Sequence, residues 1–212
     1  MQPNFQLHLG VQNHLIQNAN ALLLAYRSDP GYSYYCYKPQ TPPDRVVLED
    51  LAITLLMNSR AGLEAARSLI EKGHSIDLSI LPKKPLAQTT PQERETLAIV
   101  ISELAGLKGF AASLATKLLH KKRPALIPIL DNQAIFGAYL NPAWPTHRSS
   151  QDSVKDLNRI ISALNQISFD LTRPENILIW EQLEQIEPRL TRIEIFDSIW
   201  WMYFRKVEPV KR

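Results

Sequence analysis

The chain has 212 residues, a mass of 24.2 kDa, one cysteine and a net charge of +3 at pH 7. This length favours a single domain with a sizeable core. The lone cysteine excludes a disulfide framework, a four-thiolate zinc site and a cysteine-ligated iron–sulfur cluster within one chain. The apolar runs are far shorter than the roughly 20 residues that span a bilayer, and the first residues lack a secretion-signal pattern. We expect a cytoplasmic protein without membrane contact, whose charge permits a nucleic-acid partner without requiring one.

Apolar residues recur at helical spacing through most of the chain, which predicts an all-α fold. The first helix is expected over 5–27, and turn residues at 29–31 end it. The segment 32–38 contains four tyrosines before a proline-rich stretch, which predicts a loop or a short hairpin. Residues 46–57 are apolar on nearly all sides and predict a helix in the middle of a bundle.

The rest of the chain contains clearer helix boundaries. A helix is expected over 61–71, while 75–81 alternates like a short strand. Residues 90–93 are Thr-Pro-Gln-Glu, the spacing of a capping box, which predicts a helix from here towards Ala105. Together these patterns predict one all-α, two-lobed helical domain over 1–212. Further helices are expected at 111–121, 132–140, 151–168, 175–187 and 191–206.

One segment concentrates the positive charge of the chain. Residues 104–130 contain five of the 24 cations and no acid, so the remainder of the chain is slightly acidic. Gly106 and Gly109 lie between two expected helices, where glycine accepts a sharp turn and exposes backbone N–H groups. The N-terminus of the second helix favours a phosphate. A turn of amides with cations behind it is typical of a nucleic-acid backbone contact.

The same segment resembles a known motif. Residues 107–111 are Leu-Lys-Gly-Phe-Ala, with Ala115 four residues on, and are similar to the hairpin of the helix-hairpin-helix DNA glycosylase superfamily. The stretch 123–131 is similar to the one that leads to the catalytic aspartate of that superfamily. These similarities lie within about residues 100–140. The whole chain also resembles an uncharacterised bacterial relative of the superfamily, through residues 49–52 and the spacing of Arg192, Asp197 and Trp201.

The resemblance implies a DNA glycosylase that repairs DNA by hydrolysis, and a monofunctional enzyme rather than a lyase. Asp131 would stabilise the positive charge that develops on the sugar and orient the attacking water. Ser113 occupies the position where bifunctional members have their Schiff-base lysine, and Lys117 lies one helical turn later. The expected contacts to double-stranded DNA are Lys108, Gly109, Phe110, Ala111, Ala112, Lys117, Lys121, Lys122 and Arg123.

Other interpretations of these residues remain open. Lys108 stands where the family has proline, and Ala111 where it has a second glycine. One alternative is therefore a catalytically inactive nucleic-acid-binding module, and another is an all-α protein-interaction domain in which the hairpin is only a connector. Asp131 also has the position of a helix N-cap, and the basic residues 121–123 that of a solvated helix end.

The remaining polar and aromatic residues give weaker signals. The tyrosines of 32–37, or Trp144, are candidates for the walls of a pocket for a flipped base, although such a tyrosine cluster is more often a packed loop. The tryptophans at 200–201 are expected in the core, and Asp197 with Arg192 in an internal polar contact. The five histidines lack metal-ligand spacing, so we expect neither a metal nor a cofactor.

Overall fold

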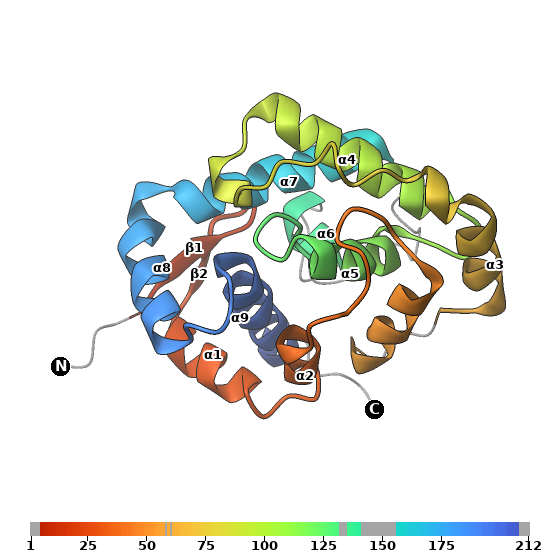
Figure 1. Cartoon of the computed structure of the whole chain (residues 1–212). Coiled ribbons are helices and arrows are strands. Elements are labelled where there is room, and N and C mark those ends of the chain that lie inside the picture. The colour runs from red at the N-terminus through yellow and green to blue at the C-terminus, as the bar shows by residue number, and fades with distance from the viewer. Residues whose placement is uncertain (1–4, 58, 60, 132–134, 141–155, 208–212) are drawn as a thin grey trace.

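A computed structural model describes residues 5–57, 59, 61–131, 135–140 and 156–207. Helices dominate this part of the chain, which confirms the predicted all-α class (Figure 1). The only sheet within it is a two-stranded hairpin near the N-terminus. None of its helices is long and apolar enough to cross a membrane.

The N-terminal region differs from the prediction of one helix over 5–27. Strand β1 (Leu7–Leu9) pairs antiparallel with β2 (His14–Ile16), and only Ala19–Tyr26 forms a helix, α1. The backbone of Gly10, Asn13 and Asn18 has positive φ angles of 79°, 53° and 55°, which a continuous helix does not allow. The apolar residues of this region therefore point into the core from a hairpin.

The segment between α1 and the capping box contains short helices. Tyr32–Cys36 forms a short helix, α2, where a loop or hairpin was expected. Leu48–Met57 is a 3-10 helix, η1, and its Leu55 is 64% exposed, so the prediction of a buried central α-helix is wrong. The expected strand over 75–81 contributes only an isolated bridge between Arg45 and Asp77. The other elements here are α3 (Leu63–Lys72), η2 (Gly73–Ser75) and η3 (Leu86–Gln88).

The predicted capping box is confirmed at the start of the next helix. The Thr90 side chain accepts a hydrogen bond from the N–H of Glu93, and the Glu93 carboxylate accepts one from the N–H of Thr90 at 2.7 Å. The remaining predicted helices are also present, and the ends that the structure describes differ from the prediction by a few residues. These helices are α4 (Pro91–Gly106), α5 (Ala112–Lys122), α6 (Ile135–Leu140), α7 (Leu157–Thr172), α8 (Pro174–Ile186) and α9 (Arg192–Val207). The predicted starts at 132–134 and 151–155 lie outside the described residues.

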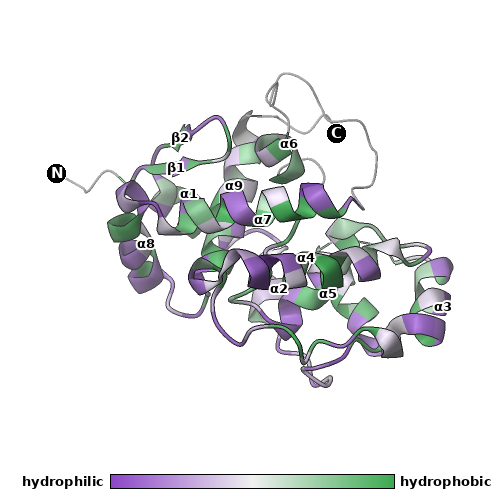
Figure 2. Ribbon diagram, turned by 90° about the horizontal axis from the view of Figure 1, so that it is seen from above, coloured by the Kyte–Doolittle hydropathy of each residue, from purple (hydrophilic) through white to green (hydrophobic). Residues whose placement is uncertain are grey.

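The elements pack in two groups joined by a long helix pair. The hairpin, α1, α8 and α9 pack together, while α3, α5 and η1 form the second group. Helices α4 and α7 lie side by side along the top of the molecule in Figure 1. Figure 2 shows hydrophilic residues on α3 and α8, at opposite ends of the molecule. Helix α9, which contains the buried Phe196 and Trp200, contacts the second group through Glu194, which lies 3.4 Å from His120 on α5.

Candidate functional site

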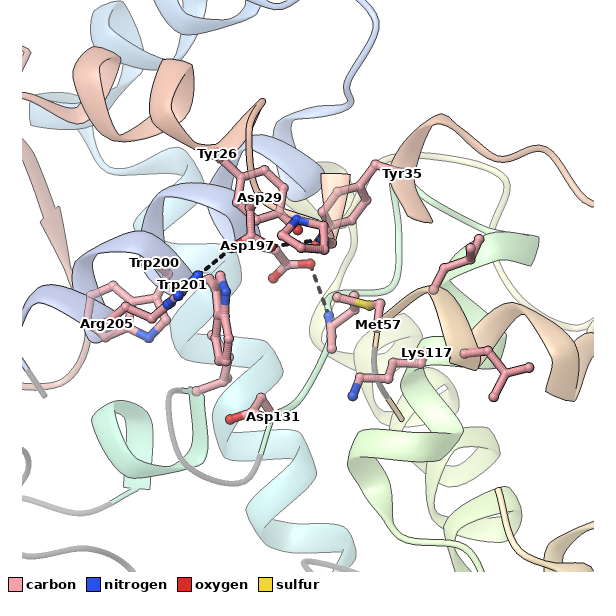
Figure 3. Close-up of a pocket in the computed structure, with 16 residues that line it drawn as sticks. Tyr26, Asp29, Tyr35, Met57, Lys117, Asp131, Asp197, Trp200, Trp201 and Arg205 are labelled. Carbon is pink, nitrogen blue, oxygen red and sulfur yellow. Dashed lines mark hydrogen bonds and ion pairs between the residues drawn. The ribbon is translucent and has the colours of Figure 1, made fainter. Parts of the chain in front are cut away.

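A pocket of about 670 Å³ opens where the two groups of elements meet (Figure 3). This volume lies within the roughly 300–1,000 Å³ range of small-molecule sites. The pocket is lined from the α1–α2 connection, the end of η1, helix α5 and helix α9, and by Ile129, Asp131 and Ile135. Its charged side chains are Asp29, Lys117, Asp131, Asp197 and Arg205, and its aromatic ones are Tyr26, Tyr35, Trp200 and Trp201.

The predicted catalytic residue Asp131 lies in this pocket, partly buried. The extended segment before it is held on both sides. The N–H of Leu130 donates to Thr116 Oγ1 on α5 at 3.0 Å, and the N–H of Ile129 donates to Asp197 Oδ2 on α9 at 3.2 Å. The backbone carbonyl of Asp131 accepts the N–H of Phe136. These hydrogen bonds fix the backbone that positions the Asp131 carboxylate. The alternative role of Asp131 as a helix N-cap involves residues 132–134, which lie outside the described residues.

Lys117 is brought into the same pocket, and Ser113 is not. The Lys117 side chain is 9% exposed, and its Nζ donates a hydrogen bond to Ser59 Oγ. Burial lowers the pKa of Lys117, and the nearby charge of Asp131 partly opposes this effect. The pocket therefore combines a carboxylate with an amine that is held in a water-poor environment.

A second carboxyl group, Asp197, also lines the pocket, a position that sequence reasoning did not predict. Its side chain was expected to contact Arg192, but Arg192 pairs with Glu184, with Nε 2.8 Å from Oε1. Asp197 Oδ2 accepts the N–H of Ile129, and its buried Oδ1 has no hydrogen-bond partner among the described residues. Helical spacing was the available signal for this position: Trp200 and Trp201 lie three and four residues after Asp197, on the same face of a helix.

The pKa of Asp197 is raised well above its usual range. Burial is the main cause, and the negative charges of Glu194 and Asp131 act in the same direction. The hydrogen bond from the N–H of Ile129 and the interaction with the Tyr35 hydroxyl oppose them. Asp197 therefore holds its proton to higher pH than an exposed aspartate does.

Aromatic side chains form the apolar walls of the pocket. Of the tyrosine cluster, Tyr35 lines the pocket, while Tyr34 is fully buried and donates its hydroxyl hydrogen bond to the carbonyl of Lys117 at 2.6 Å. Trp200 is buried as predicted, yet it also lines the pocket with Trp201. Trp144, the other proposed wall, lies outside the described residues.

The predicted phosphate-binding turn lies between α4 and α5. Gly109 has a φ of +85°, and a Cβ at this position would meet the backbone N of Ala65 at 2.5 Å, so α3 covers one side of the turn. Phe110 and Ala112 are buried. Lys108 remains 81% exposed and pairs with Glu64. Ala111 is the N-cap residue of α5, and its side chain makes no capping hydrogen bond. The N–H groups of the first turn therefore lack a side-chain acceptor from the cap position.

The basic residues Lys121 and Arg123, which were predicted to contact phosphates, are half-buried and donate hydrogen bonds to protein carbonyls. The Nζ of Lys121 donates to the carbonyls of Tyr34 and Tyr35, at 2.8 and 3.2 Å. Arg123 donates to the carbonyl of Pro43 at 2.7 Å.

Lys122 departs furthest from the prediction. Its side chain is 1% exposed and lies 2.8 Å from the Asp50 carboxylate. The prediction of a phosphate contact is wrong for Lys122, because a buried and paired ammonium group is not accessible to DNA.

Comparison with known proteins places the chain in a family. A model described as a family of unknown function (DUF6308) matches residues 19–204, and the chain belongs to this family. No curated protein and no solved structure matches the chain. Among the described residues, no group of three or more histidine, cysteine, aspartate or glutamate side chains comes together as a metal site.

Proposed function

We propose that the chain binds DNA and hydrolyses the N-glycosidic bond of a base that is turned out of the duplex into the pocket. The observation that carries this proposal is the convergence of Asp131 and Lys117 with aromatic walls in one pocket of about 670 Å³. An enzyme of this class needs such a pocket, because the target atom is not reachable inside the stack. The resemblance of residues 107–131 to the helix-hairpin-helix glycosylases supports the same function.

Asp131 supplies the central chemistry of this proposal. Cleavage of the bond develops positive charge on the sugar, and a fixed carboxylate in a water-poor site stabilises that charge. The same carboxylate orients the attacking water and accepts its proton. Lys117, which is held by Ser59, interacts electrostatically with Asp131 and keeps the carboxylate in place by charge attraction. Since Ser113 stands at the Schiff-base position, we expect hydrolysis without a covalent intermediate.

The DNA backbone would approach the turn between α4 and α5. Its exposed cation is Lys108, and the first turn of α5, where Ser113 and Leu114 are half-buried, has no side-chain cap. The ion pair between Lys108 and Glu64 is largely solvent-exposed and therefore weak, so a phosphate can replace Glu64. The inward-facing Lys121, Lys122 and Arg123 are not part of this contact.

A glycosylase assay tests the proposal. The wild type, Asp131→Asn and the matched surface control Asp77→Asn are incubated with a panel of lesion-bearing duplexes, and released base is quantified. We expect release from at least one duplex, a loss of about 100-fold or more in Asp131→Asn and no change in Asp77→Asn, whose carboxyl is exposed. The absence of release from every duplex, or equal release by Asp131→Asn, would refute the enzyme. DNA binding without release would favour the inactive binding module.

A further inference from the structure

Asp197 is a buried acid of the pocket that the proposed chemistry does not yet use. It lies on α9 beside the pocket-lining Trp200 and Trp201, and the residue is 7% exposed. Figure 3 shows its carboxyl group between Tyr35 and the segment that leads to Asp131. A buried polar atom in a native structure almost always has a partner. Oδ1 forms no hydrogen bond among the described residues, although the Tyr35 hydroxyl lies near enough to lower the pKa of Asp197, and we assign this open position to a ligand.

The hydrogen bond to the backbone determines which oxygen carries the proton. Oδ2 accepts the N–H of Ile129 at 3.2 Å, so in the protonated acid the hydrogen belongs on Oδ1. A neutral acid of this kind presents an O–H donor to the pocket. Ring nitrogens and carbonyl oxygens of nucleobases are acceptors, and they match this donor.

We propose that Asp197 Oδ1 donates a hydrogen bond to an acceptor atom of the base in the pocket and protonates that base as it leaves. This proposal rests on the proposed function, since the base is the ligand. It assigns the two carboxyl groups different roles, with Asp131 on the sugar side and Asp197 on the base side. It also names the substrate class, a base that leaves readily only when it is protonated.

The reaction balances with one water molecule. Water forms the new bond to the sugar carbon as the carbon–nitrogen bond breaks, and its proton passes to Asp131. The electron pair of the broken bond stays on the base, which receives the proton of Asp197. The products are the free base and the sugar hydroxyl. Asp131 is left protonated and Asp197 ionised, and exchange with solvent restores both.

The surroundings of Asp197 keep it protonated until the base departs. Glu194, one helical turn earlier, lies near His120 and accepts the N–H of Thr191, and its charge opposes a second negative charge on α9. Asp131 opposes it from the facing segment. On the α1–α2 side lie the hydroxyls of Tyr26 and Tyr35, of which Tyr35 favours the ionised form of Asp197, but burial outweighs it. The facing cation of the pocket from α5 is Lys117, and Arg205 on α9 is paired with Asp29.

The first test measures the proton itself and needs no substrate. Carboxyl ¹³C chemical shifts are followed against pH in the wild type and in Asp197→Asn, whose missing signal identifies Asp197. We expect that signal to show a protonated acid well above pH 4. An Asp197 that titrates at the ordinary aspartate value would overturn the inference, whatever the glycosylase assay shows.

The second test measures the contact with a base. Binding of free adenine, hypoxanthine and uracil is followed by tryptophan fluorescence, since Trp200 and Trp201 line the pocket. We expect binding that weakens as pH rises through the pKa of Asp197, and weaker, pH-independent binding in Asp197→Asn. The control is Asp170→Asn, a buried acid that accepts the N–H of Gly10 at 2.7 Å and lies outside the pocket lining. Failure of all three bases to bind would overturn the inference.

The third test separates this inference from the proposed function. On a duplex that the wild type cleaves, Asp197→Asn should lose about 100-fold in single-turnover rate and should lose the decline of rate at high pH. The loss should be clearly smaller for a base that leaves as a stable anion. If Asp131→Asn is inactive but Asp197→Asn keeps the wild-type rate and pH profile, the enzyme stands and this inference fails.

Discussion

Lys122 provides the sharpest test of how the basic segment is used, because its ammonium group lies in a closed buried network. Its Nζ lies 2.8 Å from Asp50 Oδ1 and donates to Thr41 Oγ1 at 2.7 Å and to the Pro42 carbonyl at 2.9 Å. The Asp50 carboxylate also accepts hydrogen bonds from Thr41 Oγ1 and from the N–H of Val47. The network ties α5 to the segment 41–50.

The substitution Lys122→Met keeps the volume but leaves the Asp50 charge buried and unpaired. The side chains of Lys122 and Asp50 are 1% and 0% exposed, so we expect a loss of about 3–5 kcal/mol in the free energy of unfolding. Adding Asp50→Asn removes the unpaired charge and should restore part of that loss. The assay is urea unfolding followed by circular dichroism, with stability compared at constant m-value.

A surface substitution gives the matched control. Lys108→Met removes a lysine that is 81% exposed and should change stability by less than about 0.5 kcal/mol while weakening DNA binding. If Lys122→Met lowers the free energy of unfolding by less than about 1 kcal/mol and also weakens DNA binding, the structural role of Lys122 is refuted and the predicted phosphate contact is supported.

Three further predictions concern the turn, the ion-pair cluster around the buried Glu187 carboxylate and the pocket. Gly109→Ala should lower the free energy of unfolding by about 1–3 kcal/mol, because of the positive φ and the contact with Ala65. Gly106→Ala, whose new Cβ meets no atom within 4 Å, should raise it by about 0.5–1 kcal/mol. Urea unfolding measures both changes. Arg189, Arg27 and Tyr32 lower the pKa of Glu187 to about 2, so Glu187→Gln should cost about 1–2 kcal/mol at pH 7. That cost should vanish as pH falls from about 4.5 to about 2 in pH-dependent thermal unfolding. Because the folded state raises the pKa of Asp197, the contribution of Asp197 to stability should fall as pH rises from 3.8 to that folded pKa, by about 1.4 kcal/mol per unit of separation. Asp197→Asn should lack this decline, and parallel stability curves would contradict it.

Sequence patterns predicted the helices whose ends are determined by residues close to them in the chain. The capping box at 90–93 fixed the start of α4, and apolar periodicity was sufficient for α7, α8 and α9. The N-terminal hairpin was not predictable in this way, because its leucines fit a helix as well as a strand. Its stability comes from distant residues: the N–H of Gly10 donates to Asp170, 160 positions away.

The site was predictable only in part, for a related reason. Asp131 and Lys117 stood out because they lie in or beside a recognisable motif. Asp197 did not, because its environment exists only when α9 packs against the segment 127–131 and the N–H of Ile129 reaches its carboxyl group. The burial that raises its pKa is a property of that packing and of no local pattern.

The charge distribution of the sequence acquires a different meaning in the folded chain. The five cations of 104–130 suggested a basic surface, but Lys121, Lys122 and Arg123 are bonded to protein groups and Lys117 faces the pocket. Only Lys108 among these five is mostly exposed. Salt dependence of DNA binding scales with the number of phosphates that cations neutralise. If DNA binds at this turn, the slope of log K against log salt contributed by residues 104–130 should therefore correspond to about one phosphate rather than five, and most of the specificity must come from the pocket.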